Sequence, residues 1–422
     1  MATVELTLLL GSAMALAAQT ALPPDALRLA KIKARAAVNL ARLPNYTCLE
    51  TIERSQRRVS SRRFELLDIV RLEVTVVDQK ELYAWPGSQG FEDKDITEMV
   101  SGGSIGNGSF ASHARSVFMT KAPVFTPAGE DPLHGLPAIR YNYRVPASRS
   151  AYKMRVPPME AIVGYQGSFW VDPATLDLLR LDVTMNEIPA RLPIRAGSEV
   201  LRYGRYRIGS SDFLLPQSSE MVLTDSGGNE HRNRIRFSGC REYAIESVIR
   251  FADVPERPTL SQAPPGKVEI PKDLDLDLSI ANAIEGGVSA VGDVVEAALV
   301  RDVKQKGRLV IPKGAKITGR IVRLERWPGI RQEPHWVLGL IFHRIAFENQ
   351  FALLHVRMNP IVDTRFFGPL PGRPAGRGYI PPPESPAEDP RIGILYLRGD
   401  QAKLPAGTRT LWRTGSPIEE KK

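Results

Sequence analysis

Residues that carry out catalysis or bind metals are few and scattered in this 422-residue sequence. None of the six histidines lies in a His-Glu-x-x-His motif or four residues from another histidine, the spacing that presents two imidazoles to one zinc ion. No Cys-x-x-Cys pair is present to suggest a redox or zinc site. We therefore expect no catalytic residue, no metal site and no cofactor, and a protein that is not an enzyme.

Two further groups of residues have the right types for ligand binding. A glycine-rich stretch at 102–109 precedes a predicted helix, where backbone N–H groups can hold a phosphate. It lacks the Lys-Ser/Thr pair of a P-loop, which favours a flexible turn. Asp273, Asp275 and Asp277 alternate along one strand face, so they could bind calcium or form a solvated face. We expect the solvated face.

The N-terminus predicts export. Residues 6–18 form an apolar run that ends in small residues, as in a signal peptide, and the run is too short to span a bilayer. We assign 1–18 as a signal peptide and the mature chain as periplasmic or secreted, in the cell envelope, with no transmembrane span after cleavage. The alternative is a buried helix that begins the fold.

The two cysteines agree with export. Cys48 and Cys240 are an even pair, and a disulfide between them would persist in an oxidising compartment. Two separate buried thiols are the alternative.

The net charge of +9 does not predict a nucleic-acid binder. Residues 45–255 contain 26 basic and 26 acidic residues, and 256–422 contain 25 and 19. The excess is thus spread over a long segment rather than concentrated in a stripe with interleaved aromatic residues. We expect no nucleic-acid partner.

Hydrophobic patterning predicts a mainly β protein with two domains. Residues 23–43 are typical of a helix, and 45–255 consist mostly of short alternating segments interrupted by one short helix near 108–119. A proline-rich linker at 256–267 leads to a second β domain at 268–414, which contains a flexible Pro/Gly-rich loop at 364–391.

The first domain resembles a known family. The stretch 167–181, GSFWVDPATLDLLRL, resembles the hairpin of bacterial lipoprotein carriers of the LolA/LolB type. The resemblance implies a curved antiparallel half-barrel around a short helix, which shelters an acyl chain. It identifies no acyl-binding arginine in this sequence.

The second domain resembles the small barrel of TrbI-type proteins from conjugal transfer and type IV secretion channels. The resemblance rests on GRLVIPKGAKITG at 307–319, on the Gly-Asp segment at 291–303 and on the Pro-x-Gly turn in LPAGTR at 404–409. In such turns proline fixes φ and glycine takes the tight position, which sets the strand register. The resemblance implies a small C-terminal β-barrel, and not a pore, since the spanning segments of that family are missing.

These observations predict an exported, non-catalytic envelope protein that binds lipid, or a lipidated or envelope partner. The alternatives are a structural or docking component of an envelope or secretion assembly with no ligand pocket, and an enzyme of unknown class. A short helix with an apolar face must bury that face against the sheet. The expected pocket is therefore lined by Phe110, Val117, Phe118, Phe169 and Trp170.

Overall fold

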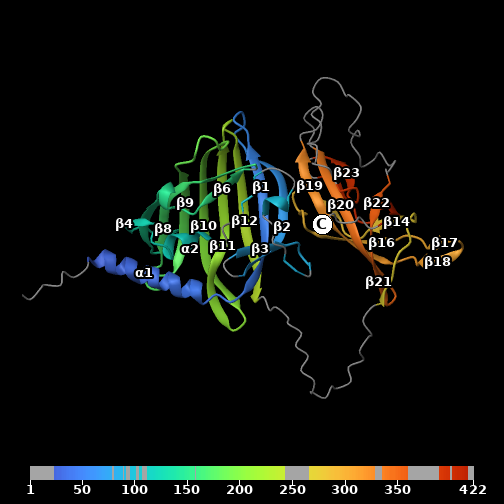
Figure 1. Cartoon of the computed structure of the whole chain (residues 1–422), viewed down its shortest axis with the longest axis horizontal. Coiled ribbons are helices and arrows are strands. Elements are labelled where there is room, and N and C mark those ends of the chain that lie inside the picture. Colours follow the sequence, from blue (N-terminus) through green and yellow to red (C-terminus); the bar gives the residue numbers. More distant parts are fainter. Residues whose placement is uncertain are drawn as a thin grey trace, which may run out of the picture.

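The computed structural model describes residues 23–77, 80–88, 90–91, 96–100, 104–106, 112–156, 158–242, 266–327, 335–359, 389–399 and 402–416. The predicted signal peptide, most of the linker and most of the Pro/Gly-rich loop lie outside these residues, as does Phe110. The mainly β fold is confirmed, with a long helix, a short helix and two large sheets (Figure 1).

The first sheet has ten strands in the order β3-β2-β1-β12-β11-β10-β9-β8-β5-β4, and every neighbouring pair is antiparallel. Its strands are β1 (Tyr46–Arg57), β2 (Glu65–Val77), β3 (Lys80–Ala84), β4 (Val124–Glu130), β5 (Ile139–Val145), β8 (Gly164–Val171), β9 (Leu178–Asn186), β10 (Ile194–Ile208), β11 (Ser211–Asp225) and β12 (Glu230–Glu242). A hairpin of β6 (Lys153–Val156) and β7 (Met159–Ile162) and two 3-10 turns, Ile96–Glu98 and Ala147–Arg149, accompany this sheet. The sheet curls into the predicted half-barrel.

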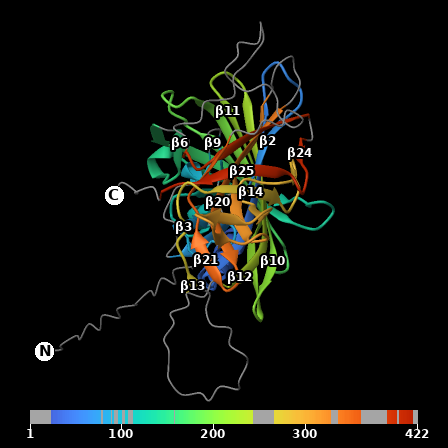
Figure 2. The ribbon, with the colours of Figure 1, turned by 90° about the vertical axis from the view of Figure 1, so that its right-hand side faces the viewer.

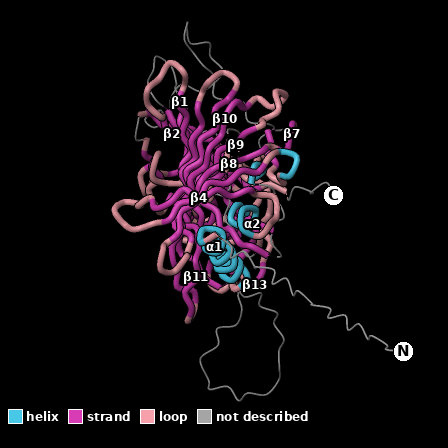
Figure 3. Tube along the Cα trace, turned by 90° about the vertical axis from the view of Figure 1, so that its left-hand side faces the viewer, coloured by secondary structure: helices cyan, strands magenta, loops and turns pink. Residues whose placement is uncertain are grey.

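Two helices lie side by side against this half-barrel (Figure 3). Helix α1 (Pro24–Ala41) begins at a proline, whose fixed φ suits the first helical turn, and it ends just before Pro44, because a residue that precedes proline disfavours the helical conformation. Helix α2 (Ser112–Phe118) is the short helix that patterning predicted near 108–119.

The disulfide cross-links two neighbouring strands inside the first sheet. Strand β1 pairs with β12, the last strand of the half-barrel, and this pairing brings Cys48 and Cys240 together. The two cysteines are bonded, with their Cα atoms 4.1 Å apart. The predicted disulfide is present.

The second sheet contains nine strands and forms the C-terminal part of the fold, which faces the viewer in Figure 2. Its strands are β13 (Gly266–Lys267), β14 (Asp275–Ile280), β16 (Val294–Leu299), β19 (Lys316–Trp327), β20 (His335–Phe347), β21 (Gln350–Leu353), β22 (Val356–Met358), β23 (Gly393–Arg398) and β25 (Arg409–Thr414). Two small ribbons flank it: β15 (Ile284–Glu285) with β24 (Lys403–Leu404), and β17 (Val303–Gln305) with β18 (Arg308–Ile311).

The second sheet is tightly curled, and large side chains fill its inside. A Cβ on Gly393 would lie 2.6 Å from Met358 Sδ, so only glycine lets β23 approach β22 this closely. The rings of Phe342 and Trp412 meet edge to face inside, with centroids 5.0 Å apart. Gly314 and Gly407 have positive φ in the two predicted Pro-x-Gly turns.

The two sheets share one hydrophobic core, which patterning did not predict. Val70 of β2 forms an isolated parallel bridge with Val291, and the Arg71 guanidinium lies 2.6 Å from the Asp293 carboxylate. Gly292 has a φ of +101°, and a Cβ there would lie 2.2 Å from the Arg71 carbonyl oxygen. Buried residues of β1, β2 and β12 belong to the same core cluster as those of β14, β16, β19 and β20. The division into two domains with a linker stays a prediction.

Of the three aspartates near β14, Asp273 and Asp275 are exposed, as expected for a solvated face, whereas Asp277 is not. Asp277 is buried and accepts hydrogen bonds from the Arg409 guanidinium, while Asp273 and Asp275 lie 3.6 and 4.0 Å from Arg413. The solvated-face expectation is wrong for Asp277, because the neighbouring strand β25 places arginines opposite these carboxylates.

Candidate functional site

Helix α2 buries its apolar face against the concave side of the first sheet. Val117 and Phe118 are fully or almost fully buried, and the Phe118 ring meets Phe169 of β8 edge to face, with centroids 5.0 Å apart. Phe169 also stacks on Tyr141 of β5 at 5.4 Å. The structure thus brings together three of the five residues that the sequence predicted for a pocket, and Phe110 lies outside the described residues.

Trp170 is the fifth predicted residue, and it lies on the opposite face of the sheet. Its ring is flanked by the guanidinium groups of Arg140 and Arg180, at 5.4 and 4.8 Å from the ring centroid. Its indole N–H donates to Asp131 Oδ2 at 3.1 Å. Successive side chains of a strand point to opposite faces, so Trp170 cannot line a pocket with its neighbour Phe169. Its assignment to the pocket was wrong.

Helix α1 also packs over the sheet beside α2, a role that was not predicted from the sequence. Its side chains at positions 32, 36 and 40 fall on one face at helical spacing. They enclose a small cavity of about 30 Å³ between α1, α2 and the sheet. The cavity is lined by Ile32, Ala36, Asn39, Leu40, Ala114, Phe118, Val171, Leu176, Leu178, Tyr203 and Leu214. We call this region the apolar seam.

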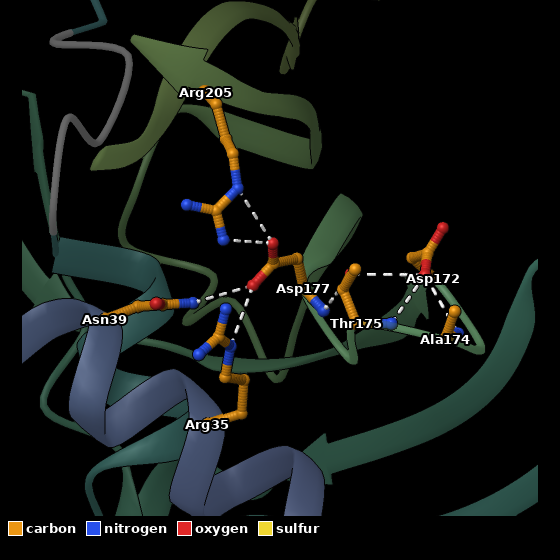
Figure 4. A network of polar contacts seen from close by, with 7 residues as sticks. All are labelled: Arg35, Asn39, Asp172, Ala174, Thr175, Asp177 and Arg205. Atoms are coloured by element: carbon orange, nitrogen blue, oxygen red, sulfur yellow. Dashed lines mark hydrogen bonds and ion pairs between the residues drawn. The ribbon is translucent and has the colours of Figure 1, made fainter. Parts of the chain in front are cut away.

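One carboxylate ties α1 to the sheet beside the apolar seam (Figure 4). Asp177 Oδ1 accepts hydrogen bonds from Arg35 Nε at 3.0 Å and Asn39 Nδ2 at 3.1 Å, both on α1. The Arg205 guanidinium of β10 donates twice to Asp177 Oδ2. Burial raises the pKa of Asp177, but the hydrogen bonds from Arg205, Asn39 and Arg35 outweigh it and hold the pKa below its usual value.

The turn between β8 and β9 presents Asp177 to α1. Asp172 Oδ1 accepts the backbone N–H groups of Ala174 and Thr175 at 2.9 and 2.7 Å, an Asx turn that folds the chain back after β8. The Thr175 backbone hydrogen bond contributes most to lowering the pKa of Asp172. A tight turn thus joins the two strands of the 167–181 stretch.

A second, polar cavity of about 320 Å³ adjoins the apolar seam near the C-terminal end of α1. It shares Asn39 and Leu214 with the seam and adds three arginines. Its lining consists of Arg35, Asn39, Arg42, Arg205, Ser211, Asp212, Phe213 and Leu214. An apolar space therefore meets a cationic one at this end of the half-barrel.

A buried histidine anchors α2 to the sheet. His113 Nε2 lies 3.0 Å from Glu199 Oε2, and the Ser219 hydroxyl donates to Glu199 Oε1 at 2.6 Å. The rings of Tyr152 and Tyr165 pack around the imidazole, with centroids 4.9 and 6.2 Å from its own. The Glu199 carboxylate lies between the Ser219 hydroxyl and the His113 imidazole. Nucleophilic catalysis needs the hydroxyl next to the imidazole, so these three residues do not have the arrangement of a catalytic triad.

Residues 102–106 read Gly-Gly-Ser-Ile-Gly and match the Gly-x-Ser-x-Gly pattern of hydrolase nucleophiles, a match not considered among the motifs above. Residues 104–106 are irregular, and 101–103 and 107–111 are not described. A Cβ on Gly106 would lie 2.7 Å from Met221 Cε, so this segment packs onto the sheet's inner face. The required strand-turn-helix is not seen in the described part of this segment.

Glu50 is an unusual buried carboxyl on the same face. It is 0% exposed, and neither carboxyl oxygen has a hydrogen-bond partner among the described residues. Burial, and next the negative charge of Glu81, raise its pKa well above the usual value.

Within the described residues, no group of three or more His, Cys, Asp or Glu side chains could hold a metal ion. No helix among them is long and apolar enough to cross a membrane.

Comparisons with known proteins found no matching family model and no matching curated protein. Three solved structures are similar to about half of this chain, each with a TM-score of 0.27. They are a DUF1329 family protein from Desulfovibrio piger (13% identity, 53% of this chain and 95% of that one), a putative outer membrane lipoprotein-sorting protein domain from Vibrio parahaemolyticus (13%, 53% and 95%) and a LolA superfamily protein from Nitrosomonas europaea (10%, 52% and 96%). At this TM-score we transfer no residue role from them.

Proposed function

We propose that this chain is an exported, non-catalytic protein of the cell envelope that binds the acyl chain of a lipid or of a lipidated partner in the apolar seam. The observation that carries the proposal is the seam itself. Of its eleven lining residues, Asn39 is the one with a carboxamide, and the others are aliphatic or aromatic. Ligand pockets are mostly apolar and have a few placed polar groups.

The seam is closed in this structure, so binding requires α1 to move. Its volume of about 30 Å³ is far below the ~300 Å³ of a small ligand pocket. Only Ile32 is fully buried among the residues of α1, and Leu27 and Val38 are 47% and 45% exposed. A helix that buries so little apolar area can leave the sheet at lower cost than a core element. Displacing it would uncover Leu178 and Phe118 for an acyl chain.

Export is supported by two independent features. The apolar run at 6–18 is typical of a signal peptide, and the Cys48–Cys240 disulfide is of the kind that persists in oxidising compartments.

The small volume of the seam favours a second candidate function. If α1 never opens, the half-barrel is a filled core, and the chain is a structural or docking component of an envelope assembly. The complete burial of Val117 and Phe169 fits this alternative equally well.

Titration with a fluorescent fatty acid distinguishes the two candidates. A matched pair of variants lies on α1: Ala36 lines the seam, and Val38 points to solvent. Ala36→Asp places a charge against the acyl chain and should weaken binding at least about tenfold, since burying an unpaired charge costs several kcal/mol. Val38→Asp should bind as the parent does.

Phe118→Asp provides a second test on the opposite wall of the seam, with circular dichroism as the control for retained strands. Binding that persists in folded Ala36→Asp and Phe118→Asp variants would contradict the seam as the site. A parent protein that binds no fatty acid and carries none in native mass spectrometry would support the docking alternative.

A further inference from the structure

The hairpin of β17 and β18 concentrates positive charge at the end of the molecule farthest from α1 (Figure 1). Residues 301–316 contain six Lys or Arg and one acidic residue, Asp302, although the whole chain has a net charge of only +9. The Asp302 carboxylate accepts the backbone N–H of Lys313 at 2.8 Å. Residues 301–316 therefore carry a net charge of +5, more than half of the net charge of the chain, and Lys304, Lys306 and Arg308 of this segment lie on the hairpin itself.

The cations of this hairpin are not neutralised by the fold. Lys304, Lys306 and Arg308 are exposed, and none of them forms an ion pair with a carboxylate among the described residues. Arginines elsewhere behave differently: Arg71, for example, pairs with Asp293. Unpaired, exposed cations are free to face an anionic surface.

The hairpin is also built to hold these groups in place. Its turn consists of Lys306 and Gly307, both with positive φ, the two-residue form that matches the twist of paired strands. Val303 and Ile311 are buried and attach the base of the hairpin to the core. Such a hairpin presents its charges with little loss of conformational freedom on binding.

An exposed leucine lies among the cations. Leu309 is 55% exposed and pairs directly with Lys304 across the two strands, so both side chains lie on one face. The segment 301–316 contains no aromatic residue on which a nucleic-acid base could stack. A cationic face with an aliphatic side chain matches an anionic lipid surface, where lysines meet headgroups and the leucine enters the interface.

We propose that the β17–β18 hairpin docks the protein onto the surface of a membrane that contains anionic phospholipids. Each Lys or Arg near such a surface strengthens partitioning about fivefold. Reversing three of them should therefore weaken it by about 100-fold or more. Binding should also fall as salt rises, since the Debye length shrinks from about 10 Å at 0.1 M to about 3 Å at 1 M.

Vesicle sedimentation of the full, oxidised chain tests this proposal. The parent should sediment with vesicles of phosphatidylcholine and phosphatidylglycerol, and not with phosphatidylcholine alone. Lys304→Glu/Lys306→Glu/Arg308→Glu should lose this binding. The turn between β1 and β2 provides the matched control, because it too is exposed and basic: Arg58→Glu/Arg62→Glu/Arg63→Glu makes the same change in net charge and should still bind.

A fluorescent label on the hairpin provides a second test that does not rely on charge-reversal variants. Both native cysteines are bonded, so Leu309→Cys adds the one thiol available to an environment-sensitive dye. Its emission should shift to the blue on anionic vesicles, while a label at Val59→Cys, in the control turn, should not shift. Equal loss in both charge variants, an unshifted Leu309→Cys label, or hairpin-dependent binding to DNA but not to vesicles would each overturn the proposal.

Discussion

Replacing Glu50 with glutamine should stabilise the protein, by an amount that grows with pH. The carboxyl is fully buried, and in the part of the chain that the structure describes it has no hydrogen-bond partner. Its pKa is raised well above the usual value, first by burial and then by the charge of Glu81. The folded state then binds a proton more tightly than the unfolded chain does. Stability therefore falls as pH rises from the unfolded pKa towards the folded one, by about 1.4 kcal/mol per pH unit.

Glutamine has nearly the same shape and no charge, so Glu50→Gln removes this fall. Urea unfolding at a series of pH values above about 4.5 should show the difference between variant and parent rising by about 1.4 kcal/mol per unit. Below that pH the two proteins should be almost equally stable, because Glu50 is then protonated in both the folded and the unfolded chain.

A matched control lies three residues further along β1. Glu53 points to the other face, where it lies 3.7 Å from Arg234 and is 42% exposed. Glu53→Gln should change the free energy of unfolding by less than about 1 kcal/mol at every pH, since an exposed ion pair contributes little. A difference between Glu50→Gln and the parent that stays constant with pH would refute the reasoning, because it would mean that Glu50 does not take up a proton on folding.

Three further predictions concern the core. Cys48→Ser/Cys240→Ser should lower the free energy of unfolding by about 4–5 kcal/mol, since the disulfide closes a long loop, and titration of the denatured parent should find no free thiol. Phe118→Ala should cost about 3–5 kcal/mol in urea unfolding, and a loss below about 1 kcal/mol would show that the contact with Phe169 is loose. Limited proteolysis should cut first within 256–267 or 364–391, and the two halves should then co-elute in gel filtration because their sheets share one core; separate elution would contradict that packing.

Local patterns in the sequence were sufficient for many elements of this fold. The helix at 23–43 is observed as Pro24–Ala41, because proline begins it and a Leu-Pro pair follows it. The Pro-x-Gly turns need positive φ, which only a residue such as glycine adopts readily, and Gly314 has it. Such features depend on a few neighbouring residues.

Contacts between residues far apart in the chain could not be predicted from local sequence patterns. The Val70–Val291 bridge joins residues more than two hundred positions apart, and neither segment carries a signal for the other. The predicted division into two domains therefore included no contact between these segments. The pairing of β1 with β12 is equally non-local, and the disulfide was predicted from the number of cysteines rather than from their positions.

The candidate site was predicted in part, and two of its errors had signals in the sequence. Phe169 and Trp170 are adjacent in a strand, so alternation alone forbids that both face α2. Ile32, Ala36 and Leu40 recur at a spacing of four, which predicts an apolar face on the first helix that must cover something. The role of Asp177 had no such signal, because its partners come from α1 and from β10.

The arrangement around Asp177 explains how α1 could leave the sheet without stranding a buried charge. Breaking a buried ion pair by removing one partner is costly, because the other charge remains uncompensated. Here Arg35 and Asn39 bind one carboxylate oxygen, and Arg205, on the sheet, binds the other through two N–H groups. When α1 departs, Asp177 keeps Arg205 and remains neutralised. At Asp177, movement of α1 therefore breaks the ion pair with Arg35 and the hydrogen bond from Asn39. The two hydrogen bonds from Arg205 to Oδ2 stay behind, and they hold the turn before β9 in place for α1 to return.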